Sequence, residues 1–146
     1  MNFKNCIKNS ILLFILFSSL ATISKEKQLA TNTEKFSLSI FQNQSQAIIV
    51  KVKPEKYRKS LESKIVTPEK LVARRIDFSE AFKQVKGTLT KEERKKLILY
   101  GSLADLRQEG ECWAIESFGN GMTSEIAGYI DVKSGKLVFL WLIPEG

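Results

Sequence analysis

The segment Leu137–Ile143 is apolar at every position and ends at Pro144. A strand with this composition has no polar face to turn toward water, so both of its faces must be covered. We therefore expect a helix layer on one face. On the other face we expect loops, an N-terminal β-hairpin or a partner.

Two further segments predict that this strand closes an antiparallel three-stranded meander. Cys112–Phe118 alternates with a period of two, and a second strand runs through Ile126–Val132. The residues 119–121, Gly-Asn-Gly, favour a turn between them. Lys133-Ser134-Gly135 predicts a hairpin turn with Gly135 at positive φ.

The clearest helix is predicted at Asp77–Gly87, and we expect it to back the meander. Asp77 and Glu80 have the spacing of a capping box, and Gly87 is expected to end the helix. The apolar positions form one stripe, at Phe78, Ala81, Phe82 and Val85.

Further helical segments are predicted on either side of this helix. Glu55–Arg75 predicts a short helix, a break at Thr67-Pro68 and a second helical turn at Leu71 and Val72.

A second capping box, Thr90 with Glu93, predicts a helix that continues to Tyr100, where Gly101 caps or kinks it. Ser102 with Asp105 starts a further turn.

The N-terminal part of the expected domain predicts a β-hairpin. Phe36–Ile40 and Ile48–Val52 both alternate, and Pro54 is expected to end the second strand. Together these elements predict an α+β fold with an N-terminal hairpin, two or three helices and a C-terminal meander packed on a helix.

Residues 1–21 have the features of a cleavable export signal. Lys4 and Lys8 precede the apolar run Ile11–Phe17, and small residues follow it. We expect residues 22–35 to be a flexible leader and residues 36–146 to be one domain. The expected location is periplasmic or secreted, with membrane contact only through an uncleaved signal.

The chain has no histidine, and Cys112 is its one cysteine beyond the predicted signal. This composition excludes Ser-His-Asp and Cys-His catalysis, histidine-ligated zinc, a four-cysteine zinc site and an intramolecular disulfide. We therefore expect no catalytic residue, cofactor or metal site. Cys112 is expected to be a buried free thiol.

Three segments together resemble a PepSY-type domain. They are the helix with Asp77, Glu80 and Ala81, then Trp113-Ala114-Ile115, and then the terminal hairpin Tyr129–Leu137 with its Asp-Val-Lys-Ser-Gly-Lys stretch. The resemblance covers about half of the expected mature chain. It implies a helix packed on an antiparallel sheet, in a non-catalytic extracytoplasmic module that binds or inhibits another protein.

A basic surface is the predicted contact for such a partner, because residues 51–107 carry twice as many basic as acidic side chains. Export favours an envelope protein, a peptidase or a toxin over nucleic acid as the partner. The basic candidates are Arg74, Arg75, Lys83, Lys86, Lys91, Arg94, Lys95 and Lys96. Trp113 and Trp141 are candidate contacts as well, although both also suit core positions.

Three alternatives remain open at the level of sequence. A periplasmic immunity protein that neutralises a toxin has the same features. A glycan-acting envelope enzyme requires two carboxylates from among Glu109, Glu111 and Glu116. A homodimer paired through the C-terminal strands needs no foreign partner.

Overall fold

The computed structural model describes residues 31–67, 70–118 and 124–142, and these residues form an α+β fold, as predicted. The chain divides into two units, Met1–Lys35 and Phe36–Gly146, and the second unit holds every strand of the described sheet. Among the helices of the described residues, none has the length and apolar character needed to span a membrane.

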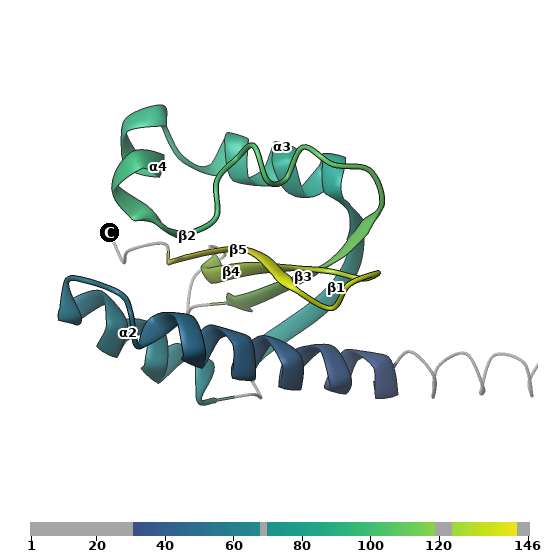
Figure 1. Ribbon diagram of the computed structural model, residues 1–146, viewed down its shortest axis with the longest axis horizontal. Coiled ribbons are helices and arrows are strands. Elements are labelled where there is room, and N and C mark those ends of the chain that lie inside the picture. Colours follow the sequence, from purple (N-terminus) through teal and green to yellow (C-terminus); the bar gives the residue numbers. More distant parts are fainter. Residues whose placement is uncertain (1–30, 68–69, 119–123, 143–146) are drawn as a thin grey trace, which may run out of the picture. The chain divides into compact units, whose positions relative to one another are not determined.

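In the part of the chain that the structure describes, five strands form one antiparallel sheet in the order β1-β3-β4-β5-β2 (Figure 1). The strands are β1 (Leu71–Asp77), β2 (Ile98–Tyr100), β3 (Glu111–Phe118), β4 (Ser124–Asp131) and β5 (Leu137–Leu142).

Strands β3, β4 and β5 confirm the predicted meander. Gly128 of β4 pairs with Ile115 on one side and with Leu140 on the other. Gly135 adopts the predicted positive φ, at 66°, in the turn between β4 and β5. The predicted turn at residues 119–121 lies outside the described residues.

Helices cover both faces of the sheet (Figure 1). Residues 31–49 are helical, and the part of this helix from residue 36 onward, which we call the N-terminal helix, shares one face with α2 (Glu55–Ile65). Helix α3 (Phe78–Thr88) packs on the opposite face, and α4 (Lys91–Leu97) follows it.

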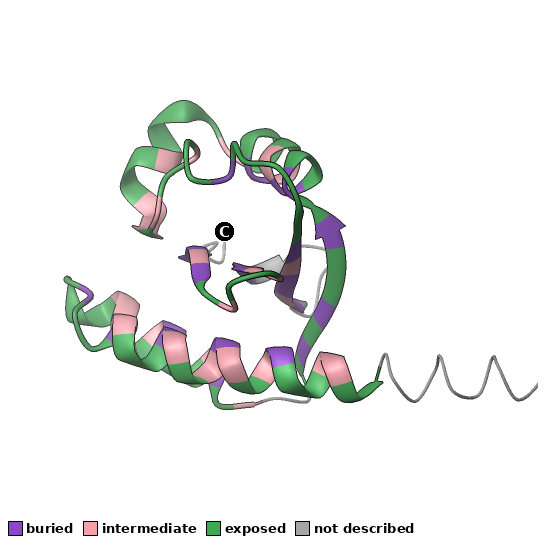
Figure 2. Ribbon diagram, turned by 45° about the vertical axis from the view of Figure 1, so that its right-hand side comes forward, coloured by how far each residue is buried: buried purple, intermediate pink, exposed green. Residues whose placement is uncertain are grey.

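This arrangement provides the cover that β5 requires on both of its faces. Leu140 and Leu142 belong to the core cluster under the N-terminal helix and α2, whereas Phe139 and Trp141 belong to the cluster under α3. All four are buried, and Figure 2 shows buried positions along the strands and on the helices beside them. The apolar strand is therefore covered by its own chain.

The prediction of an N-terminal hairpin from this alternation is wrong, because residues 36–49 are helical. Buried positions recur at helical spacing, at Ser37, Phe41, Ser45 and Ile49. Phe36 begins the apparent strand pattern yet is 66% exposed. The glutamines between the two apolar runs, which a hairpin would place in its loop, are good helix formers. Residues 31–35, predicted to be the end of a flexible leader, are helical as well.

Two glutamines attach the N-terminal helix to the rest of the fold. The Gln42 side chain donates to the carbonyl of Ile65 at the end of α2, with 3.1 Å between N and O. The Gln44 amide donates to the Gly135 carbonyl and accepts from the Leu137 amide, so it bonds both backbone positions around the β4–β5 turn. The polar residues of the assumed loop therefore hold the helix against the sheet.

Pro54 does not end a strand, but precedes the first residue of α2 as its N-cap. The predicted helix after Glu55 is confirmed, whereas the predicted helical turn at Leu71 and Val72 is wrong, because these residues begin β1. Arg74 and Arg75 are adjacent and both exposed at the edge of the sheet, so they interrupt the alternation of apolar and polar residues by which a strand is recognised.

The capping box of Thr90 and Glu93 is confirmed, with bonds in both directions. The helix that it opens ends at Leu97, however, so the predicted continuation to Tyr100 is wrong and these residues form β2. Gly101 follows at φ +75°, where an added Cβ would lie 2.3 Å from the Val138 carbonyl oxygen. The chain turns closely around β5 at this glycine, which excludes a continuing helix.

Helix α3 lies where the sequence predicts it, with Asp77 at the N-cap but without the predicted side-chain capping bond. Gly87 lies within the helix and does not end it. The predicted turn after Ser102 is present, because the Asp105 carboxylate accepts hydrogen bonds from the Ser102 amide and hydroxyl.

Candidate binding pocket

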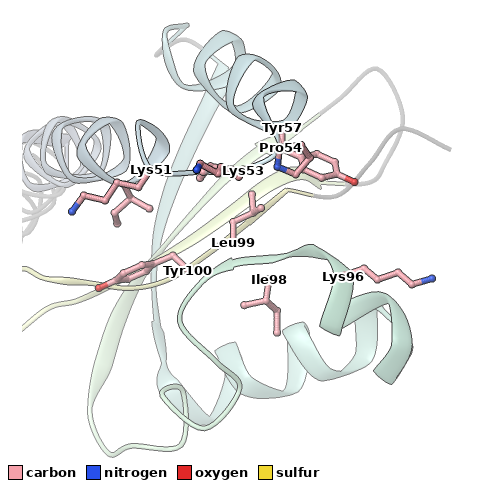
Figure 3. Close-up of a pocket in the computed structure, with 10 residues that line it drawn as sticks. Lys51, Lys53, Pro54, Tyr57, Lys96, Ile98, Leu99 and Tyr100 are labelled. Atoms are coloured by element: carbon pink, nitrogen blue, oxygen red, sulfur yellow. The ribbon is translucent and has the colours of Figure 1, made fainter.

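A pocket of about 540 Å³ lies between the loop that precedes α2 and the strand β2 (Figure 3). Its volume falls within the roughly 300–1,000 Å³ of typical ligand sites. Its lining combines three lysines, two tyrosines and five apolar residues. They are Lys51, Lys53, Lys96, Tyr57, Tyr100, Ile48, Val52, Pro54, Ile98 and Leu99. We call it the lysine–tyrosine pocket.

One wall comes from the turn between the N-terminal helix and α2. The amides of Lys51 and Val52 donate to the carbonyls of Ile48 and Ile49, which closes the helix and turns the chain. Pro54 then starts α2, and the Tyr57 amide donates to the Pro54 carbonyl. Tyr57 therefore lies in the first turn of α2, beside the pocket.

The opposite wall comes from the end of α4 and from β2. Ile98 pairs with Trp141 of β5, and Tyr100 pairs with Leu140. Leu99 packs against the core cluster beneath the N-terminal helix, whereas Ile98 packs against the cluster beneath α3. Tyr100 remains 40% exposed, so an aromatic ring is available at this wall.

The three lysines carry charge that their own surroundings do not neutralise. Among the described residues, none of the three forms an ion pair. Lys96 makes a minor electrostatic contribution to the lowered pKa of Glu93, whose main cause is the hydrogen bond from the Thr90 side chain. Of the described residues that line the pocket, none is acidic. Its surface is therefore apolar and aromatic with a positive rim.

Figure 3 shows the Lys51 and Lys96 side chains extending from opposite sides of the pocket, away from each other. Their ammonium groups do not converge on one point. The rim therefore offers separated positive charges, which suit several separated negative groups better than one compact anion.

The structure does not bring the predicted basic residues together as one free surface. Arg74 forms ion pairs with Glu80 and Glu116, at 3.5 and 3.7 Å, and Arg75 pairs with Glu111 at 2.5 Å. These two arginines on β1 are therefore engaged within the fold.

The remaining predicted cations lie on α3 and α4. Arg94 donates to the carbonyls of Lys86 and Leu89, both at 2.6 Å, and so holds the connection between the two helices. Lys95 pairs with Glu92 at 3.9 Å. Lys83 is exposed on α3, as are Lys86 and, on α4, Lys91. Of the predicted set, only Lys96 lines the pocket.

The two tryptophans predicted as partner contacts are core residues to different degrees. Trp141 is 2% exposed, so its ring cannot meet a partner at the surface. Trp113 is partly buried against the cluster that contains Ile115. Trp141 is therefore a core residue, and Trp113 packs at the margin of the core.

The glutamates considered for glycan hydrolysis do not form a facing pair. Glu111 and Glu116 are five residues apart on β3, so their side chains leave opposite faces of the sheet. Each is also paired with an arginine, Arg75 and Arg74 respectively. Glu109 precedes the strand and is separated from it by Gly110 at φ +105°. Glu111 and Glu116 therefore do not provide the facing carboxylate pair that glycan hydrolysis requires.

Cys112 is buried and free, as predicted. Burial, with a smaller contribution from nearby acidic groups, raises the pKa of its thiol from 9.0 to about 12. The side chain is therefore an uncharged thiol at neutral pH and a poor nucleophile. The described residues contain no group of three or more acidic, cysteine or histidine side chains arranged to hold a metal ion.

Comparisons with protein-family models, with curated proteins and with solved structures find no significant match. The resemblance to PepSY-type domains therefore stays a prediction. Packing of α3 against the meander is compatible with it, whereas β1, β2, α2 and the N-terminal helix are additional to the segments that carry the resemblance.

Sequence reasoning missed most of the lysine–tyrosine pocket because its two walls are 40 residues apart in the chain. The predicted hairpin places Lys51 on a strand, and the predicted helix extends to Tyr100, so neither pattern brings the two walls together. One available signal was the absence of acidic residues between Gln42 and Pro54, which leaves Lys51 and Lys53 without a local partner.

Proposed function

We propose that this chain is an exported, non-catalytic protein-binding module of the cell envelope, whose partner presents an acidic segment to the lysine–tyrosine pocket. The observation that carries the proposal is the contrast in charge. Arg74, Arg75 and Lys95 are paired with acids of their own fold, whereas Lys51, Lys53 and Lys96 surround a pocket whose described lining contains no acidic residue. Positive charge left unpaired beside aromatic and apolar surface supports recognition of an acidic protein.

Binding of this kind serves inhibition directly, because a bound segment of a peptidase or toxin is withdrawn from its own substrate. The PepSY resemblance supports a peptidase or another envelope protein as the partner. In the immunity-protein alternative, the partner is a toxin.

The test is a quantitative capture experiment on envelope fractions with the full chain as bait. The site variant is K51Q/K53Q/K96Q, and the matched control is K59Q/K83Q/K133Q, which removes the same charge from exposed positions outside the pocket. We expect one envelope protein to be retained by wild type and control, to be lost with the site variant, and to dissociate as salt rises.

The identity of that protein distinguishes a peptidase from a toxin. Equal capture by the site variant and the control contradicts the proposal, because the pocket lysines then contribute nothing specific. Circular dichroism and denaturation of both variants establish that they remain folded. The substitutions are at surface positions, where effects on stability stay within about 0.5 kcal/mol.

A further inference from the structure

We propose that the acidic segment of the partner binds in an extended conformation, as a strand added to the free edge of β2, with an apolar side chain in the lysine–tyrosine pocket. This inference rests on the proposed function and specifies the partner's conformation. It follows from how the two edges of the sheet differ.

The outer edge of β2 is open in the part of the chain that the structure describes. Strand β2 is the last in the sheet order and pairs only with β5. Ile98 pairs with Trp141 and Tyr100 with Leu140, the residue next to it, so the register shifts and Leu99 is the extra residue of a β-bulge. The side of β2 that faces away from β5 has no partner strand among the described residues, and Leu99 lines the pocket beside it.

The opposite edge of the sheet is protected in a different way. β1 spans seven residues, and its Arg74 and Arg75 are paired with glutamates of the same fold. Short strands, bulges and charged side chains keep sheet edges from pairing, and all three are found at β2, which has three residues, a register shift and lysines in the pocket beside it. This positive charge opposes a basic strand, whereas an acidic strand would neutralise it.

Charge selects the occupant of this edge. A second copy of the chain that paired through β2 would bring its own Lys96 against this lysine-rich rim, and like charges at such short range oppose association. A compact anion would meet only one of the separated ammonium groups (Figure 3). An extended segment with acidic residues at alternate positions and an apolar residue between them meets both walls at once.

The probe is a synthetic heptapeptide, acetyl-Asp-Val-Glu-Ile-Asp-Val-Glu-amide, with a lysine-for-acid counterpart and a version N-methylated at alternate amides. Affinity for the full chain is measured by fluorescence anisotropy. We expect the acidic peptide to bind, the basic one to show no binding, and N-methylation to weaken binding about tenfold or more, because main-chain bonds supply part of the affinity.

Amide hydrogen exchange gives a second readout that side-chain recognition alone would not change. We expect amides of β2 to exchange several-fold more slowly when the acidic peptide is bound, while the amides of β1 are unaffected.

Equal affinity for the methylated peptide, or unchanged exchange throughout β2, overturns the added-strand inference. Absence of any peptide binding, competition by millimolar citrate as strong as that by the peptide, or a dimer of the chain itself in light scattering also overturns it. In each case the proposed function stands if the site variant K51Q/K53Q/K96Q still loses the captured envelope protein, and fails if it does not.

Discussion

Gly128 in the middle of β4 lies directly beneath the ring of Phe41. A Cβ added at this glycine would lie 2.0 Å from Cε2 of Phe41, so the fully buried Phe41 ring or the helix that carries it must shift. The absent side chain is therefore what lets this helix approach the sheet. We expect Gly128→Ala to lower the free energy of unfolding by about 1–3 kcal/mol, the usual cost of overpacking a core.

Urea denaturation measures this effect, and Gly87→Ala is the matched control, because nothing lies within 4 Å of a Cβ at that helical position. We expect the control to gain roughly 0.5–1 kcal/mol, since alanine is the better helix former. Phe41→Leu in the Gly128→Ala background should recover part of the loss. Unchanged stability of Gly128→Ala would show that the helix is not seated on β4 as described.

A second prediction at the residue scale concerns Cys112. Its pKa rises from 9.0 to about 12 through burial, so between these values the folded state keeps a proton that the unfolded state has released. The stabilising contribution of the thiol is therefore complete below pH 9 and is lost as pH rises toward 12. We expect wild type to lose stability over pH 9–10.5 more steeply than Cys112→Ala.

The comparison with Cys112→Ala is needed because burial also raises the pKa of Tyr129, which titrates toward the same alkaline range. Iodoacetamide, with the labelled peptide identified by mass spectrometry because the sequence also contains Cys6, supplies an independent measurement. We expect no labelling of Cys112 in the folded protein at pH 8 and complete labelling of it in urea. Rapid labelling of Cys112 in the native state would contradict a buried, protonated thiol.

At the scale of elements, α4 depends on its cap more than any other described helix. It has seven residues and no buried side chain, and its N-terminus is held by the reciprocal bonds of Thr90 and Glu93. We expect Thr90→Ala to speed amide exchange within α4 about fivefold, the equivalent of the roughly 1 kcal/mol that loss of an N-cap usually costs. Since Lys96 lies on α4, capture of the partner should weaken as well.

Thr88→Ala is the control for this prediction. The Thr88 hydroxyl donates to the Gln84 carbonyl inside α3, so the same atoms are deleted two residues away without touching the cap. Exchange in α4 that responds equally to both substitutions would contradict a specific role for Thr90.

The elements that sequence reasoning identified correctly carry local signals that tertiary contacts do not override. The meander has period two and turn residues, and Thr90 with Glu93 is satisfied within one turn of helix. The elements that it misassigned are decided by distant contacts. Ile98–Tyr100 becomes a strand because β5 offers an edge, and residues 36–49 become a helix because Phe41 and Ile49 reach the far side of the sheet.

The pocket could not be predicted for the same reason. Its walls are the loop before α2 and the strand β2, and β2 exists only once β5 is in place. By contrast, the exclusion of catalysis by an imidazole needed no structure, because the chain has no histidine. Sequence thus limited the chemistry, whereas the position of the site required the fold.

At the scale of the whole molecule, stability requires both helix layers, because the sheet between them has no wet face. The N-terminal helix allows this to be tested within one element: Ile49 is fully buried, whereas Phe36 on the same helix is 66% exposed. We expect Ile49→Asp to abolish cooperative unfolding near neutral pH. The destabilisation from a buried unpaired carboxylate and from the loss of a core side chain together approaches the free energy of unfolding of a typical domain, about 5–15 kcal/mol. Phe36→Asp should unfold within about 0.5 kcal/mol of wild type. If instead Ile49→Asp keeps its thermal transition and the exchange protection of β4 and β5, the sheet is stable without this layer, and the apolar strand β5 does not need cover on both faces.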